Sequence, residues 1–228
     1  MEYRHELKFL VTDNQLKLLA FRLSPFLKKD INQVEDFYLI KSLYFDNFNN
    51  SYLMENLNGE DRRSKYRIRV YDNSLNVIKL EKKSKVRGMT RKEAVNISEE
   101  ECMQLMQGVI PIRESAENNK KLRMFTEMKV NGLKPCVIVE YARTAYVNKI
   151  GNVRITFDRN IKGATAKEFF SNTSKVYPVL PKGIHILEVK YDEFLPSYIY
   201  DLIDDGTLQQ TAFSKYRYAR DIVEGIYL

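Results

Sequence analysis

Several segments of the chain alternate polar and apolar residues, which is the pattern of β-strands with one polar and one apolar face. In KYRIRVY, Lys65, Arg67 and Arg69 are separated by single aromatic or aliphatic residues. This alternation, together with short runs rich in β-branched and aromatic residues, predicts strands at residues 3–11, 37–45, 64–71, 76–83, 87–97, 135–147, 153–157 and 184–191. Asp72-Asn73-Ser74 is the expected hairpin connection between two of them.

Helical periodicity and capping residues predict helices between these strands. Asp13 is the expected N-cap of a helix that ends before Pro25. Ser98 and Glu101 form a capping-box pattern at the start of another helix. The expected helices span residues 13–23, 50–57, 98–107 and 115–130, further helical segments follow residue 191, and residues 162–183 are expected to be rich in loops.

The predicted strands are distributed from one end of the chain to the other, with no internal repeat or linker between them. We therefore expect a single α+β domain over residues 1–228. Many strands with few obvious edges favour closure of the sheet on itself. The predicted fold is a closed antiparallel β-barrel with helices packed outside.

Charged residues share one face of these strands, because residues at i, i+2 and i+4 point to the same side. The shared faces hold Lys65, Arg67, Arg69 and Tyr71; Lys79, Glu81 and Lys83; Arg154, Thr156 and Asp158; and Glu188 with Lys190. A half-buried sheet whose polar face meets water would explain any one of these strands. If the sheet closes, however, the cations line its interior and need water or an anionic ligand, and a chain of phosphates would satisfy them.

The acids on this face are few, and two interpretations of them remain open. Glu6, Glu81, Asp158 and Glu188 could be ion-pair partners that orient neighbouring cations. Alternatively, at least one of them, with Glu188 as the candidate, binds a divalent cation such as Mg²⁺ or Mn²⁺ beside phosphate oxygens.

Composition narrows the class of partner. Of the 228 residues, 44% are apolar, which indicates a packed core. The net charge of +7 indicates a polyanionic partner such as nucleic acid, an anionic membrane or phosphate. No helix-turn-helix, RNP or zinc signature is visible, and neither a P-loop nor a dinucleotide-binding glycine motif occurs, so no nucleic acid is expected. Neither a signal peptide nor a transmembrane segment is recognisable, and we expect a cytoplasmic protein.

Eight short segments carry a family resemblance in order along the chain. They are YRHELKFLV at the start, SLYFDN at 42–47, KYRIRVY at 65–71, LEKK at 80–83, YARTAYV at 141–147, VRITFD at 153–158, ILEVKY at 186–191 and FSKY at 213–216. With these segments the chain resembles the catalytic domain of the vacuolar transporter chaperone (VTC) family, the polyphosphate polymerases, within the wider group of triphosphate tunnel metalloenzymes. Each motif is weak alone, whereas the ordered set is fairly specific.

The resemblance implies a tunnel barrel that transfers the γ-phosphate of ATP to inorganic polyphosphate or pyrophosphate with Mn²⁺ or Mg²⁺ as cofactor. By this resemblance the candidate catalytic cations are Arg67, Arg69, Arg154 and Lys83, and Glu188 would bind the metal. The candidate substrate-binding residues are Lys8, Arg143 and Lys215 by the same resemblance, with Lys79 and Lys190 added because they share the charged face.

Two rival functions use the same basic tunnel. A hydrolase would cleave tripolyphosphate or a nucleoside triphosphate with water, and Glu6 or Glu81 could serve as its base. A non-catalytic module would only bind polyphosphate or RNA. The N-terminal pattern is a single Glu6-x-Lys8 rather than the fuller ExExK of the triphosphatase branch, which favours the polymerase.

Overall fold

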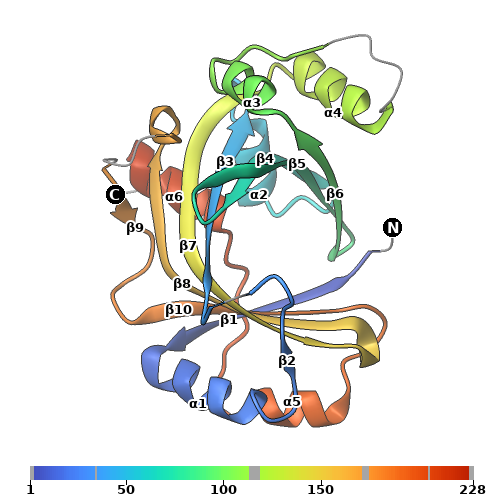
Figure 1. Cartoon of the computed structure of the whole chain (residues 1–228), viewed down its shortest axis with the longest axis vertical. Helices are drawn as coiled ribbons and strands as arrows, with labels where there is room; N and C mark the ends of the chain where they lie inside the picture. Colours follow the sequence, from blue (N-terminus) through green and yellow to red (C-terminus); the bar gives the residue numbers. More distant parts are fainter. Residues whose placement is uncertain (1–2, 34, 113–118, 171–174, 205, 226–228) are drawn as a thin grey trace.

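A strongly curled antiparallel sheet organises the chain (Figure 1). The structure is a computed structural model and describes residues 3–33, 35–112, 119–170, 175–204 and 206–225. The main strands are β1 (His5–Thr12), β3 (Tyr38–Asp46), β4 (Arg63–Tyr71), β5 (Ser74–Val86), β6 (Met89–Ile97), β7 (Lys134–Asn148), β8 (Val153–Thr165) and β10 (Ile184–Tyr191). Their order is β1-β10-β8-β7-β3-β4-β5-β6, while the short β2 (Lys28–Lys29) pairs with β7 and β9 (Tyr177–Pro178) with β8.

The sheet curls into a half-barrel, and its two edges meet at a single point. Arg4 and Thr90 exchange backbone hydrogen bonds of 2.9 and 3.0 Å, forming an isolated bridge between the segment before β1 and the start of β6. No ladder continues from this bridge among the described residues. The predicted closed barrel is therefore corrected to an open, curled sheet, because β1 and β6 diverge beyond the first bridging pair.

Most helices cover the convex side of the sheet (Figure 1), whereas α6 (Lys215–Glu224) begins on the concave side, where Tyr216 packs against Tyr44, so the prediction that helices pack outside holds in part. The helices are α1 (Asp13–Leu23), α2 (Ser51–Leu57), α3 (Glu99–Met106), α4 (Asn119–Val130), α5 (Ser197–Ile203) and α6, with 3-10 turns at Ile150–Asn152 and Ala166–Glu168. α1 and α5 pack side by side on β8 and β10, where Leu19 and Ile199 join Phe157 and Leu187 in one apolar cluster. A second cluster lies between α3, α4 and the β4–β6 strands. Within the described part of the chain, none of the helices combines the length and the apolar character needed to cross a membrane.

The hairpins on either side of β5 depend on left-handed backbone. Asp72 and Asn73 have φ values of 49° and 53°, and Arg87 and Gly88 have 49° and 78°. Two such residues in succession make the turn that matches the twist of a two-residue hairpin. Ser74 consequently begins β5 rather than belonging to the turn, and Arg87, expected to start a strand, lies in the second turn.

Two other boundaries differ from the sequence prediction, and a third cannot be compared. Thr12, not Asp13, is the N-cap of α1, because its hydroxyl accepts from the Gln15 amide while the Gln15 side chain accepts from the Thr12 amide. β8 continues to Thr165 through the segment expected to be a loop, because the long β7 offers it a partner as far as Val137. α4 is described from Asn119, and the predicted start of this helix, at residues 115–118, lies outside the described residues.

Candidate functional site

The concave face of the sheet encloses a polar cavity of about 360 Å³. Nine of the ten candidate site residues line it: Lys8, Arg67, Arg69, Lys83, Arg143, Arg154, Glu188, Lys190 and Lys215. They come from β1, β4, β5, β7, β8, β10 and the start of α6, so segments separated by most of the chain contribute to one site. The fold thus brings together side chains that the alternation had indicated and three that only the resemblance had indicated, namely Lys8, Arg143 and Lys215.

Lys79 is the candidate that does not line this cavity. It shares the parity of Lys83, but its ammonium lies 5.7 Å from the ring of Tyr71 near the hairpin end of β5. The register of β4 and β5 shifts between Arg69 and Tyr71. Such an irregularity increases the local twist, which explains why parity alone misplaces a side chain at the end of the hairpin.

Strand register places acids and cations of the site in alternating rows. Lys8 on β1 lies opposite Glu188 on β10, and the next row joins Glu6 to Lys190. Lys190 in turn lies opposite Arg154 on β8. Because opposite residues on one face lie closest, each acid is next to a cation before any ligand binds.

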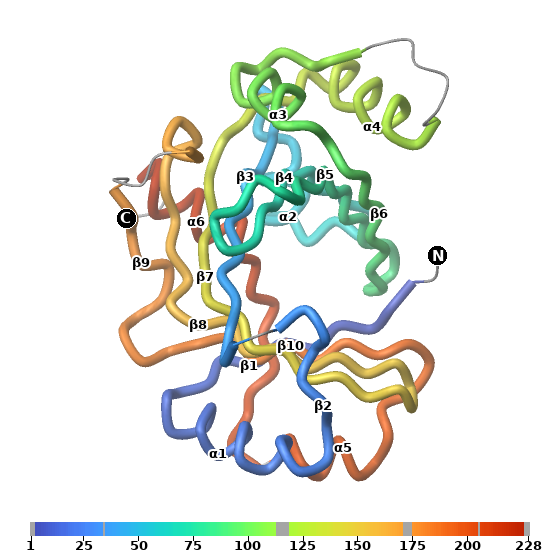
Figure 2. The backbone as a smooth tube through the Cα atoms, in the orientation of Figure 1, coloured from blue at the N-terminus to red at the C-terminus, as the bar shows by residue number. Residues whose placement is uncertain are grey.

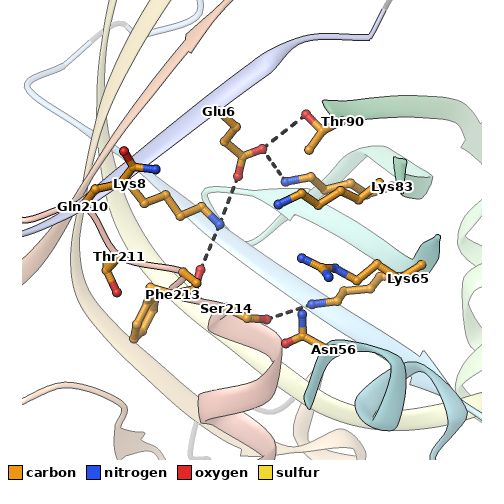
Figure 3. Close-up of a pocket in the computed structure, with 13 residues that line it drawn as sticks. Glu6, Lys8, Asn56, Lys65, Lys83, Thr90, Gln210, Thr211, Phe213 and Ser214 are labelled. Atoms are coloured by element: carbon orange, nitrogen blue, oxygen red, sulfur yellow. Dashed lines mark hydrogen bonds and ion pairs between the residues drawn. The ribbon is translucent and has the colours of Figure 1, made fainter. Parts of the chain in front are cut away.

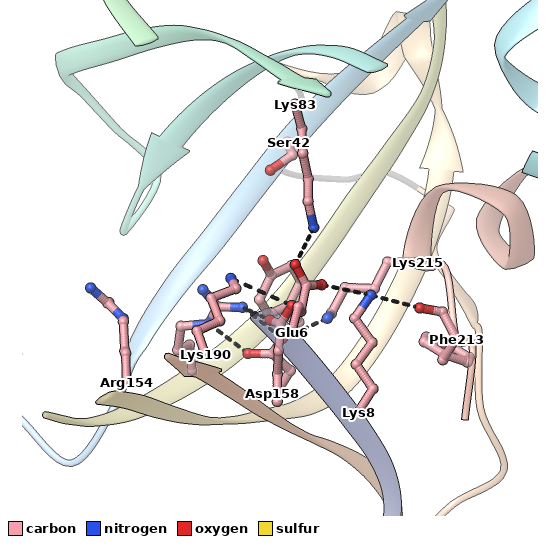
Figure 4. Close-up of polar contacts among 12 residues, drawn as sticks. Glu6, Lys8, Ser42, Lys83, Arg154, Asp158, Lys190, Phe213 and Lys215 are labelled. Atoms are coloured by element: carbon pink, nitrogen blue, oxygen red, sulfur yellow. Dashed lines mark hydrogen bonds and ion pairs between the residues drawn. The ribbon is translucent and has the colours of Figure 1, made fainter. Parts of the chain in front are cut away.

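The carboxylates of the site are all bound by cations (Figure 4). Glu6 pairs with Lys83 at 2.6 Å and with Lys8 at 3.0 Å. Asp158, which is fully buried, accepts two hydrogen bonds from Arg143 at 2.6 and 2.7 Å and pairs with Lys215 at 2.6 Å. Burial alone would raise the pKa of Asp158, but Arg143 and Lys215 hold it far below its usual value. These acids are therefore ionised and keep their cations in fixed positions.

Glu188 has weaker partners than Asp158. Its closest cations, Arg143 and Lys190, are both 3.4 Å away. Burial and the neighbouring Glu6 raise the pKa of Glu188, whereas Lys190 and Lys215 lower it and prevail.

The donor set suits Mg²⁺ or Mn²⁺ bound jointly with phosphate. No group of three or more potential His, Cys, Asp or Glu ligands exists among the described residues. Mg²⁺, however, commonly binds through one or two carboxylates and the oxygens of its substrate, without a complete protein cage. Glu188 and Glu6 fit the protein's share of such a site, and sequence reasoning had proposed only Glu188.

Lys65 was missing from the predicted site set although it lies on the same face of β4 as Arg67. It lines the cavity, donates a hydrogen bond of 2.8 Å to the Ser214 hydroxyl and lies 5.1 Å from the Tyr216 ring. Burial and the nearby ammonium groups of Lys8 and Lys83 depress the pKa of Lys65 well below its usual value. Its position in the alternating segment was the signal that could have identified it.

A second basic cavity of about 340 Å³ adjoins the first (Figure 3). The two share Glu6, Lys8, Lys65, Lys83, Thr90 and Ser214 along their boundary. Arg63 and Lys85 extend the cationic lining of the second cavity beyond the central one. The cationic lining therefore continues from the central cavity into the second one.

Tyrosine side chains are the other group that sequence reasoning missed. Tyr38 accepts a hydrogen bond from Arg154 at 3.0 Å, Tyr44 from Arg67 at 2.9 Å and Tyr141 from Arg69 at 3.3 Å. Each hydroxyl thus contacts a different arginine of the cavity. The fifteen tyrosines of the chain gave no indication of which ones have this position.

Comparison with known families gives a match over nearly the whole chain. The model of the VTC domain matches residues 3–223. The chain belongs to the VTC domain family. None of the curated protein sequences matches this VTC domain.

Solved structures show that the fold of this VTC domain occurs elsewhere. A proposed adenylate cyclase from Bacillus halodurans is 14% identical, with a TM-score of 0.51 over 88% of this chain and 86% of that one. A second proposed adenylate cyclase, from Vibrio parahaemolyticus, is 13% identical over 88% and 84% of the two chains, with a TM-score of 0.48. The Mimivirus capping enzyme triphosphatase is 13% identical over 90% and 91%, with a TM-score of 0.38. At this identity the first likeness shows a shared fold.

Proposed function

We propose that this VTC domain is a polyphosphate polymerase that transfers the γ-phosphate of ATP to a growing inorganic polyphosphate chain. The observation that supports it most is the convergence of cations from seven elements of the fold on one cavity, continued by a second basic cavity. A chain that lengthens one phosphate at a time needs cationic surface on both sides of the reacting centre.

The reaction would depend on positioning and charge neutralisation rather than on a protein nucleophile. The terminal oxygen of orthophosphate, pyrophosphate or the growing chain attacks the γ-phosphorus of ATP. The bond between the γ-phosphorus and the bridging oxygen breaks, and ADP leaves with that oxygen and its electron pair. One phosphoryl group is thereby transferred and no water is consumed.

The cavity residues have complementary parts in this reaction. The guanidinium groups of Arg67, Arg69 and Arg154 can each donate two hydrogen bonds to phosphate oxygens, whereas Lys8, Lys83 and Lys215 act as point charges. Mn²⁺ or Mg²⁺ bound at Glu188, with Glu6 beside it, would neutralise charge on the phosphate oxygens.

The rival hydrolase is less well supported because its candidate bases are occupied. Glu81 does not line the central cavity, and its oxygens are bound by Arg67 and Lys92 at 2.7 and 3.2 Å. Glu6 is bound by two lysines. An ionised carboxylate held by cations is a poor base for water, because those cations lower its proton affinity.

Incubation with ATP and Mn²⁺, followed by gel separation of polymer from orthophosphate, tests the proposal. We expect long chains that disappear with a chelator and with Arg69→Ala, while Lys129→Ala on the exposed face of α4 serves as the matched control. Release of orthophosphate without chains would instead identify a hydrolase. Binding of tripolyphosphate with no turnover at all would identify a binding module.

A further inference from the structure

Three residues form a row across adjacent strands on the cavity side of the sheet. Tyr44 on β3 lies directly opposite Arg67 on β4, and Arg67 lies directly opposite Glu81 on β5. The arginine is therefore flanked by an acid on one side and a phenol on the other. This arrangement follows from register alone, because opposite residues on one face of a sheet are nearest neighbours.

The two neighbours use the inner donors of the guanidinium group. Arg67 donates from Nε and Nη2 to one oxygen of Glu81 at 2.8 and 2.7 Å. Its Nη1 donates to the Tyr44 hydroxyl at 2.9 Å. A guanidinium group has five N–H bonds, so one on Nη1 and one on Nη2 remain. When the Tyr44 hydroxyl accepts the Nη1 proton on the Cδ side, these two are the parallel end-on pair, which can bind two phosphate oxygens in a bidentate manner.

We propose that Glu81, supported by Tyr44, is a positioning residue that fixes the Arg67 guanidinium so that its remaining N–H pair faces the cavity. Glu81 is 0% exposed and absent from the cavity lining, whereas Arg67 lines it. The acid thus acts through the arginine and does not meet the phosphate. The proposal rests on the proposed function, since it specifies how one phosphate-binding arginine of that site is oriented.

Glu81 also contacts other cations that line the cavity. Its other oxygen accepts from Lys92 at 3.2 Å, and Arg69 lies 3.7 Å from the oxygen that binds Arg67. Burial would raise the pKa of Glu81, but Arg67, Arg69 and Lys92 together hold it far below its usual value. A permanently ionised, fully buried acid can keep arginine in one orientation without a reorganisation cost when charge develops in the transition state.

The variant Glu81→Gln separates positioning from simple electrostatics. Loss of a negative charge beside an anion site should, by Coulomb's law, leave tripolyphosphate affinity unchanged or increase it. Loss of orientation should nonetheless lower kcat by about 10²-fold, the scale of a misplaced reacting group. Glu93→Gln on β6, whose acid pairs with Arg123 rather than with a cavity cation, is the matched control. A folded Glu81→Gln enzyme with kcat within about twofold of wild type would overturn the proposal.

A double-mutant cycle with Arg67→Met tests whether Glu81 acts through that arginine. We expect Glu81→Gln to cause little further loss of kcat once Arg67 is replaced, whereas equal losses in both backgrounds would contradict the proposal. If Glu81→Gln does not fold, Tyr44→Phe keeps the ring and removes only the second contact. It should cost about five- to tenfold in kcat with the same non-additivity, and Tyr146→Phe in the α1–α5 core is its control.

Side-chain NMR tests the orientation without any turnover. The Nε–H signal of Arg67 is assigned by its loss in Arg67→Met. In the wild type this proton should exchange slowly with solvent. In Glu81→Gln the signal should broaden or disappear, while the Tm of the folded variant is retained. An unchanged signal would overturn the positioning role even if polymer is made. Conversely, a slow signal in a wild-type protein that makes no polymer would contradict the proposed function and leave the positioning intact.

Discussion

Lys65 and Ser214 connect β4 to the beginning of α6 through a hydrogen bond of 2.8 Å between ammonium and hydroxyl. The same hydroxyl caps α6 by accepting from the Arg217 amide. No carboxylate of the described residues lies within ion-pair distance of this ammonium. A half-buried cation without a counter-ion, next to Lys8 and Lys83, destabilises the ligand-free fold.

The Lys65→Met variant should therefore melt at a higher temperature than the wild type at neutral pH. The folded-state pKa of Lys65 is lower than the value in the unfolded chain, so the unfolded chain binds this proton more tightly. The free energy of unfolding therefore decreases as pH falls from about 10.5 through the pKa of Lys65 in the folded state. It stays reduced at lower pH. Melting curves between pH 6 and pH 11 should show a gain for Lys65→Met that vanishes above about pH 10.5, each kcal/mol corresponding to roughly 2–4 °C. Lys129→Met, at an exposed position, should show no such gain, and a lower Tm for Lys65→Met would contradict the interpretation.

Tripolyphosphate should stabilise the fold more than chloride at equal ionic strength. The ligand binds the folded cavity and not the unfolded chain, which gives about 2.7 kcal/mol at a hundredfold excess over Kd. That corresponds to a rise in Tm of roughly 5–10 °C for a chain of this size. Thermal shift measurements at matched ionic strength check this, and equal shifts with both salts would indicate general screening of surface charge.

Arg69→Ala and Arg67→Ala should differ in stability while sharing a loss of activity. Each removes a donor aimed at phosphate, and we expect about 10²-fold lower turnover for both. Arg69 has long contacts to Ser42 and Tyr141, both 3.3 Å, so its removal should leave the Tm unchanged or raise it. Removal of Arg67 takes the closest partner from the buried Glu81 and should cost about 3 kcal/mol. Chemical denaturation beside turnover measures both effects, and equal stability of the two variants would contradict the pairing of Arg67 with Glu81.

Glu188→Gln should separate metal-dependent turnover from binding. The amide keeps the shape of the side chain but loses the charge that attracts Mn²⁺ or Mg²⁺, so turnover should collapse. Tripolyphosphate without metal should still bind, at equal or higher affinity, because a repulsive charge has left the cavity. Calorimetric titration with and without Mn²⁺, alongside turnover, provides the measurement. Turnover like that of the wild type in a folded variant would remove Glu188 from the metal site.

The sequence was sufficient to predict where most side chains of the regular strands face, because that depends on local alternation, whereas Lys79 beside a register shift was misplaced. The segment from Lys65 to Tyr71 has cations on one face and Tyr66, Ile68 and Val70 on the other, and the structure buries the latter three in the core. The ordered motifs likewise predicted the family, which the match over residues 3–223 confirms. The roles of the individual site residues remain predictions.

Features that depend on contacts between distant strands could not be predicted in this way. Tyr44 and Glu81 lie next to Arg67 only because β3 and β5 pair with β4 in one particular register. The open edge of the sheet depends on how far β1 and β6 diverge after the Arg4–Thr90 bridge, which reflects the twist of the whole sheet. Glu6 entered the candidate metal site for a similar reason, since its neighbour Glu188 lies at the other end of the chain.

The pairing of β1 with β10 has a consequence for synthesis on the ribosome, where the two strands emerge far apart in time (Figure 2). At 5–20 residues per second, the roughly 180 residues between them take on the order of 10–40 s to appear. β1 has no ladder partner among the described strands until then, because its other β-bridges are isolated ones: Arg4, just before β1, pairs with Thr90, and Phe9 pairs with Gln210, which is made after β10. The nascent chain therefore exposes β1, with its alternating apolar residues, without its ladder partner until β10 has been synthesised. Charged Glu6 and Lys8 on this strand protect it from pairing with other chains during that interval.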